Sequence, residues 1–275
     1  MSDDAVHEAQ DRASHDQQDG RVRIEAALGA GEFVLYYQPK VDLLDGRVVG
    51  AEALIRWQHP ERGLLAPGQF FHLIEDSDLA ATLGRWVFET AIAQAGEWQR
   101  VGLAIAVNVN VAALHLRSPA FAEDVDAALA AHPDVPPATL ELEVTETTVL
   151  ADLAGMAAVI DACRRCGVRF ALDDFGSGRM SLADLRGLRV DSLKIDQSLV
   201  RDMLGDGDNQ AMVEGIVGLG RAFRREVVAV GVETAAHCVA LINLGCTLGQ
   251  GYGIARPMPA EELADWMRRR PSASA

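Results

Sequence analysis

The sequence predicts an α/β fold in which a largely parallel sheet closes into a (β/α)8-type barrel. Three observations lead to this prediction. Short apolar, β-branched segments alternate with segments whose apolar residues recur at helical spacing. The chain has 275 residues, enough for one barrel-sized domain. Polar residues stand at the carboxyl ends of several predicted strands, and in a closed parallel barrel these ends meet at one mouth.

The first two predicted strands form a hairpin. Residues 33–39 are rich in aromatic and β-branched side chains, and an Asp-Gly turn separates them from residues 48–57. In the second strand a period of two places Glu52 and Arg56 on one face with Leu54. A charged face on an otherwise apolar strand must meet either water or a functional site.

The remaining elements follow from the spacing of apolar residues. Further strands are predicted at residues 103–111, 140–145, 168–172, 192–196, 227–232 and 248–254. Helices are predicted at residues 21–28, 79–99, 152–166, 181–186, 210–223, 235–244 and 259–269, with another helical stretch beginning at Pro67.

Composition limits the possible functions. The formal net charge is −15, so the chain is a poor candidate for binding polymeric nucleic acid, whose phosphates need lysine and arginine. A small anionic ligand stays possible if metal ions reverse the local field. No apolar run is long enough to cross a bilayer and no signal peptide is recognisable, which favours a cytoplasmic protein. Residues 1–19 and 269–275 are expected to form flexible tails around a domain at residues 20–268.

The stretch from Ala171 to Gly178 delivers two adjacent carboxylates, Asp173 and Asp174, into a glycine-rich turn. Neighbouring like charges are most stable where a cation neutralises them, and hard divalent metals are suited to this role. The alternative is a solvated Asp-Asp turn or a helix N-cap, which is ordinary loop chemistry.

Two other groups of residues have simpler interpretations. Cys163 and Cys166 are spaced as a C-x-x-C, but they lie in a predicted helix and are interpreted as buried small hydrophobic residues. The segment 206–208 resembles part of a calcium loop, lacks the rest of one, and is interpreted as a turn.

Strand-end motifs occur in a specific order along the chain. They are Tyr36-Tyr37-Gln38-Pro39, Glu52-Ala53-Leu54 followed by Arg56-Trp57, Asn108, Glu143-Val144-Thr145-Glu146, Asp173-Asp174-Phe175-Gly176, Leu193-Lys194-Ile195-Asp196 and Gln250-Gly251-Tyr252. This set resembles the EAL-domain family of cyclic di-GMP phosphodiesterases over residues 21–266. The resemblance implies a modified TIM-like barrel with one antiparallel strand, and hydrolysis of cyclic di-GMP to linear pGpG.

The resemblance also implies roles for individual residues. Two ions, Mg²⁺ or Mn²⁺, would be held by Glu52, Asn108, Glu143, Asp173 and Asp174. Lys194 would orient the attacking water or balance charge, so that Lys194, Asp174 and Glu52 form the catalytic group. Glu146 would stabilise the Asp-Asp loop, while Asn110 is interpreted as a hydrogen-bonding barrel residue. Substrate contacts would come from Gln38, Leu54, Arg56, Gln250 and Pro257.

The chain departs from the family pattern at three places. The most important is Val230, which stands where similar enzymes carry a glutamate that binds the second ion, and valine offers neither charge nor lone pair. The others are the loop at 179–181 and the pair Gly253-Ile254, near the expected position of a nucleotide base.

The departures leave more than one function open. One is a phosphodiesterase with a weakened second ion site. Another is a receptor that binds cyclic di-GMP and signals through a protein partner, and a third is an unrelated metal-dependent barrel enzyme. Homodimer formation and a sensory or GGDEF domain upstream in a longer parent protein are further expectations from the resemblance.

Overall fold

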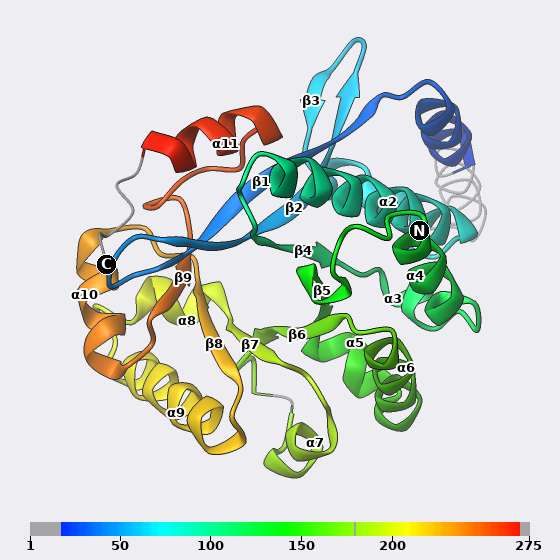
Figure 1. Cartoon of the computed structure of the whole chain (residues 1–275). Coiled ribbons are helices and arrows are strands. Elements are labelled where there is room, and N and C mark those ends of the chain that lie inside the picture. The colour runs from blue at the N-terminus through cyan, green and yellow to red at the C-terminus, as the bar shows by residue number, and fades with distance from the viewer. Residues whose placement is uncertain (1–17, 179, 270–275) are drawn as a thin grey trace, which may run out of the picture.

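Eight strands close into a barrel in the computed structural model, which describes residues 18–178 and 180–269. The strands are β1 (Phe33–Asp42), β2 (Val48–His59), β3 (Gly63–Leu65), β4 (Ala106–Asn110), β5 (Leu140–Thr145), β6 (Arg169–Phe175), β7 (Ser192–Ile195), β8 (Glu226–Val230) and β9 (Leu248–Gln250). Their order is β1-β9-β8-β7-β6-β5-β4-β2, and pairing of β1 with β2 closes the ring. The short β3 extends from β2 outside the ring (Figure 1). The predicted barrel is confirmed.

One strand of the barrel runs against the others. β1 pairs antiparallel with both β2 and β9, whereas the other neighbouring pairs of the ring are parallel. The hairpin explains this, because the short connection near Gly46, which has φ of 74°, reverses the chain before β2 begins. The modification expected from the family resemblance is therefore present.

Helices surround the barrel (Figure 1). They are α2 (Asp78–Arg100), α3 (Ala113–Leu116), α4 (Phe121–Ala130), α5 (Glu146–Ala151), α6 (Leu153–Arg165), α7 (Leu182–Gly187), α8 (Gln197–Asp202), α9 (Gly207–Phe223), α10 (Ala235–Leu244) and α11 (Ala260–Arg269). Residues 18–29 form a helix as well. None of the helices in the described part of the chain is long and apolar enough to cross a membrane.

Several predicted boundaries were wrong. The helical stretch expected from Pro67 is two single 3₁₀ turns, Pro67–Gln69 and Phe71–Leu73. The helix expected at 152–166 is preceded by α5, and Asp152 separates the two by accepting a hydrogen bond from the Gly155 amide at 3.0 Å. Local capping ended these helices where apolar spacing showed no break.

The predicted domain limits also shift slightly. Residues 18 and 19 belong to the first helix rather than to a tail, and Arg269 ends α11. The helix at residues 18–29 buries Ile24 and Ala27 in an apolar cluster beside Phe33 and Trp57. The rest of both predicted tails, residues 1–17 and 270–275, lies outside the described residues.

The main core fills the space between the barrel wall and the helices. In β4, Val107 and Val109 belong to this core, while Asn108 and Asn110 lie on the opposite face of the strand. Polar residues of the strands can therefore gather inside the barrel while apolar residues anchor the wall from outside.

A buried histidine stabilises the packing of α2, α3 and α4. The His115 ring stacks on Phe88 at 5.4 Å between centroids, and its Nε2 lies 2.9 Å from Asp124 Oδ2, which Arg85 also contacts at 3.3 Å. Its Nδ1 is buried without a hydrogen-bond partner and faces Gly84, where a Cβ would lie 2.3 Å away. Burial lowers the pKa of His115, although the Asp124 carboxylate opposes this shift.

We predict that His115 makes the fold less stable at acidic pH. Because the pKa of the folded-state imidazole is depressed, the unfolded chain binds this proton first as the pH falls below about 6.5. The unfolding free energy should therefore decrease from about pH 7 to pH 5 by more in the unaltered protein than in His115→Gln. Thermal unfolding of both proteins across this range measures the difference, and identical pH dependence would contradict the assignment.

Candidate active site

Polar side chains from six strands meet inside the barrel near the carboxyl ends of its parallel strands. We call this group the mouth cluster, and it consists of Glu52, Asn110, Glu143, Asp173, Lys194 and Gln250. All but Asn110 and Asp173 are buried. The period of two along each strand directs these side chains inward, and closure of the barrel brings the strands together.

Lys194 lies at the centre of the mouth cluster. Its Nζ is 3.1 Å from Glu52 Oε2 and 3.3 Å from Asp173 Oδ2, and it also donates to Glu143. Burial on its own would lower the pKa of Lys194, but the surrounding carboxylates raise that pKa well above its usual value. The ammonium therefore stays charged and links β7 to the three strands that carry these carboxylates, β2, β5 and β6.

The two buried glutamates of the cluster have opposite properties. Burial would raise the pKa of Glu52, yet the Lys194 charge and hydrogen bonds from neighbouring amides hold it below its ordinary value. Burial and the nearby Glu52 charge raise the pKa of Glu143 well above the ordinary value. One ammonium cannot balance three carboxylates, so Glu143 is the carboxylate that takes up a proton most readily.

The two asparagines of β4 lie on the same face of the strand. Asn110 Nδ2 donates to Glu52 Oε1 at 2.6 Å, which agrees with its interpretation as a hydrogen-bonding barrel residue. Asn108, the predicted ion ligand, pairs with Glu52 in the register of β2 and β4, and its Nδ2 donates to Glu141. Asn108 Oδ1, the atom that could bind an ion, is buried without a hydrogen-bond partner.

The donor atoms of the mouth cluster fit a hard divalent cation. They are carboxylate and amide oxygens, the ligands that Mg²⁺ and Mn²⁺ prefer. Glu143 Oε1 is buried without a hydrogen-bond partner, which is costly unless a cation or proton is supplied. Within residues 18–178 and 180–269, no group of three acidic, histidine or cysteine side chains is already arranged as a metal cage, and the Lys194 ammonium lies among the carboxylates instead.

The double-aspartate loop follows β6. Asp174 has a positive φ of 54°, unusual for a residue with a side chain, and burial together with the Asp173 charge raises its pKa. Glu146 contacts this loop as predicted, accepting hydrogen bonds from Ser177 Oγ at 3.1 Å and from the Met180 amide. Arg179, the first residue of the loop at 179–181 where the chain departs from the family pattern, lies outside the described residues.

The predicted substrate-contact residues divide into two groups. Gln38 and Gln250 are buried and bonded to each other at 3.0 Å, and Gln250 also donates to Glu52 at 2.7 Å, so these glutamines orient the cluster. Arg56 is partly buried, with its guanidinium 5.8 Å from the Tyr36 ring centre. Pro257 is partly buried and directly precedes Met258, which pairs with β1.

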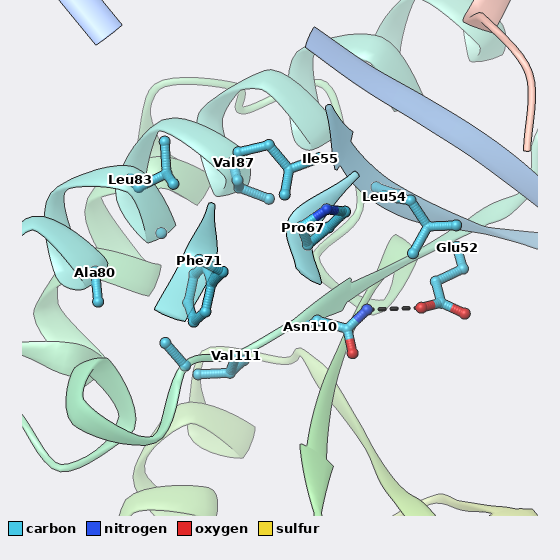
Figure 2. Close-up of a pocket in the computed structure, with 13 residues that line it drawn as sticks. Glu52, Leu54, Ile55, Pro67, Phe71, Ala80, Leu83, Val87, Asn110 and Val111 are labelled. Carbon is cyan, nitrogen blue, oxygen red and sulfur yellow. Dashed lines mark hydrogen bonds between the residues drawn. The ribbon is translucent and has the colours of Figure 1, made fainter. Parts of the chain in front are cut away.

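An apolar pocket of about 390 Å³ opens beside Glu52 and Asn110. Figure 2 shows Leu54 and Pro67 close to the carboxylate, with Phe71 and Leu83 farther along the pocket. This size suits a small organic ligand. Sequence reasoning identified Leu54 but missed Pro67 and Phe71, because two single 3₁₀ turns bring them to the pocket.

Val230 is the residue that, by the family resemblance, stands in place of a glutamate ligand of the second ion. It ends β8, is partly buried, and pairs with Gln250 of the mouth cluster. Glu226 is at the opposite end of β8, where it binds Arg169 at 2.6 Å, and Glu233 is exposed beyond the strand. Neither glutamate lies in the mouth cluster.

The cysteines contribute nothing to this site. Cys163 and Cys166 are free thiols on α6, and burial raises the pKa of Cys163 to about 12. The segment at 206–208 serves as the start of α9, with Asp206 accepting from the Asp208 amide at 2.8 Å.

The fold and the site together define an α/β-barrel protein with an acidic, lysine-centred site at the carboxyl ends of its strands. The family model for the EAL domain matches residues 21–257, and the chain belongs to the EAL domain family.

Two curated proteins whose names state a function are similar to this chain in sequence. A cyclic di-GMP phosphodiesterase of Pseudomonas aeruginosa is 38% identical over 247 residues, covering 90% of this chain and 42% of that protein. The bifunctional diguanylate cyclase/cyclic di-GMP phosphodiesterase MucR of the same species is 40% identical over 241 residues, covering 87% and 35%. The chain thus spans less than half the length of these two relatives.

A solved structure agrees with the fold. The PaMucR phosphodiesterase in its c-di-GMP complex has a TM-score of 0.85 and 39% identity, covering 89% of this chain and 99% of that one. The two relatives and this solved structure are all named as phosphodiesterases.

We predict that Lys194 contributes strongly to stability. Lys194→Met leaves three neighbouring carboxylates without their cation and should lower the unfolding free energy by about 3–5 kcal/mol at neutral pH. Carboxylates with raised pKa bind protons preferentially in the folded state, so part of this loss should be recovered as the pH is lowered toward 5. Urea unfolding of the variant and the unaltered protein, without added metal, tests this; equal midpoints would refute it.

Proposed function

We propose that this chain is a cyclic di-GMP phosphodiesterase that hydrolyses one phosphodiester bond of its substrate to give linear pGpG. The observation that carries the proposal is the mouth cluster, in which three carboxylates and an amide surround a buried lysine at the carboxyl ends of the barrel strands. Membership of the EAL family and similarity to proteins named as cyclic di-GMP phosphodiesterases support it.

The proposed cofactor is a pair of Mg²⁺ or Mn²⁺ ions. Glu52, Asn108, Glu143 and Asp173 would hold one ion, and Asp173 with Asp174 would hold the other. When bound, such ions would lower the pKa of the attacking water and stabilise the attacking and leaving oxygens. The buried Asn108 Oδ1, which has no hydrogen-bond partner, supports the place of Asn108 in this set.

The protein's own groups position the substrate and the water. Lys194 carries a charge at neutral pH, so it attracts the negative charge that develops on the phosphoryl oxygens and hydrogen-bonds to the attacking water. The Arg56 guanidinium is suited to binding the second phosphate of cyclic di-GMP, the one that is not cleaved. The water oxygen forms the new P–O bond, one ester P–O bond breaks, and the departing oxygen leaves as a hydroxyl.

The apolar pocket would take one guanine base. Leu54, Pro67 and Phe71 provide flat apolar surface next to the Glu52 carboxylate, so a base there places the adjoining phosphate near the mouth cluster. Gln38 and Gln250 would then act by orienting Glu52 rather than by touching the base.

A receptor without turnover is the second candidate function. Val230 favours it, because this residue ends β8 beside Gln250 and offers no oxygen to an ion. In this case the chain binds cyclic di-GMP and acts on a protein partner. Homodimer formation and upstream sensory or GGDEF domains are proposed for the longer protein on the family resemblance alone.

We predict that the unaltered protein releases pGpG and that Val230→Glu accelerates the release. Metal-site partners typically contribute about 10–100-fold to affinity or activity, and a restored carboxylate should add a gain in this range. Chromatography of cyclic di-GMP incubated with Mg²⁺ or Mn²⁺ measures turnover, with Glu52→Ala as the inactive control. Binding without turnover in the unaltered protein, with activity only in Val230→Glu, would establish the receptor instead.

We predict different effects for the two asparagines. Asn108→Ala removes a proposed ion ligand and should weaken Mn²⁺ binding by at least about tenfold. Asn110→Ala leaves that ligand set in place and should have a smaller effect. Calorimetric titration with Mn²⁺ in the absence of nucleotide compares the two, and a greater loss in Asn110→Ala would make Asn110 the ligand instead.

A further inference from the structure

A second polar cluster lies inside the barrel, below the mouth cluster. We call it the lower cluster, and it consists of Lys40, Asn108, Glu141 and Ser192. All four side chains are buried, with exposed fractions between 0% and 6%. Buried charged groups are rare unless they are paired, so the cluster needs an explanation. Of these residues, the reaction proposed above uses only Asn108, as an ion ligand.

Glu141 of β5 is the centre of the lower cluster. Its Oε2 accepts from Lys40 Nζ at 3.0 Å and from Asn108 Nδ2, and its Oε1 accepts from Ser192 Oγ at 2.8 Å. Arg169 adds a more distant ionic contact to Oε1 at 3.7 Å. One carboxylate thereby connects β5 with strands β1, β4, β6 and β7 across the barrel interior.

The lower cluster and the mouth cluster are related residue by residue. Three lower residues lie two positions from a member of the mouth cluster, on the same face of the same strand, and Lys40 lies two positions from Gln38, which accepts a hydrogen bond from Gln250 of that cluster. The pairs are Lys40 with Gln38, Asn108 with Asn110, Glu141 with Glu143, and Ser192 with Lys194.

Strand β2 is adapted to the same layer. Gly50 lies two positions before Glu52, and a Cβ there would lie 3.1 Å from both Lys40 Cε and the Ala106 carbonyl oxygen. Glycine at this position leaves room for the lysine stem that reaches Glu141.

We infer that Glu141 is a positioning residue for the ion site, acting through the strands it connects. A short strand segment is stiff, so hydrogen bonds that hold residue 141 against residues 108 and 192 also hold residue 143 against residues 110 and 194. Outer partners of metal ligands orient the ligands that they support. This inference rests on the proposed ion site.

The test is Mn²⁺ binding to Glu141→Gln, measured calorimetrically without nucleotide. We expect binding about 10–100-fold weaker than in the unaltered protein, with a matching fall in kcat and little change in KM. Glutamine keeps the size of the side chain but leaves Lys40 without its counter-charge. The double variant Lys40→Met/Glu141→Gln removes that charge, so it decides the question if the single variant fails to fold. It should also bind Mn²⁺ more weakly than the unaltered protein.

Two controls separate the outcomes. Ile160→Val truncates a core residue of α6, away from both clusters, and should lose stability without losing Mn²⁺ affinity. If Glu141→Gln and the double variant bind Mn²⁺ as the unaltered protein does, while Asn108→Ala binds weakly, Glu141 serves stability alone and the inference is overturned. If the unaltered protein itself does not bind Mn²⁺, the proposed ion site fails and the inference fails with it.

Discussion

The organisation of this protein depends on one buried ammonium among three carboxylates. Lys194 Nζ lies within 3.3 Å of Glu52 and Asp173 and contacts Glu143, so it links β7 with β2, β5 and β6. Carboxylates so close together would repel one another without a cation, and the desolvation of each would be costly. The lysine makes the cluster stable enough to exist inside the barrel.

The barrel interior is polar in two successive layers, and its exterior is apolar. Alternation along the strands produces this division, since Val107 and Val109 contribute to the outer core while Asn108 and Asn110 face inward. Hydrogen bonds satisfy most of the buried polar atoms, and Glu141 and Glu52 each accept from three side chains. Glu143 Oε1 is an exception without a partner, and it lies in the mouth cluster.

Much of the fold and part of the site could be predicted from the sequence. The barrel strands were identified because their apolar periods are strong, and the sequence motifs placed Glu52, Glu143, Asp173 and Lys194 correctly in one cluster. Period two assigns both asparagines of β4 to one face, and it cannot tell that Asn110 hydrogen-bonds to Glu52 while Asn108 donates to Glu141. The pocket was only partly found, because Pro67 and Phe71 reach it through two single turns without periodic spacing.

The sequence by itself determined the succession of strands along the chain, the face of each strand that is polar, and the motifs that identify the family. These properties can be found in short segments, because they depend on which side chains follow one another along a few residues. Only the tertiary structure decided the depth of each polar side chain, the partnership of Asn110 with Glu52, and the junction of five strands at Glu141. Barrel closure and the stagger of neighbouring strands set these contacts, and they involve residues up to 101 positions apart.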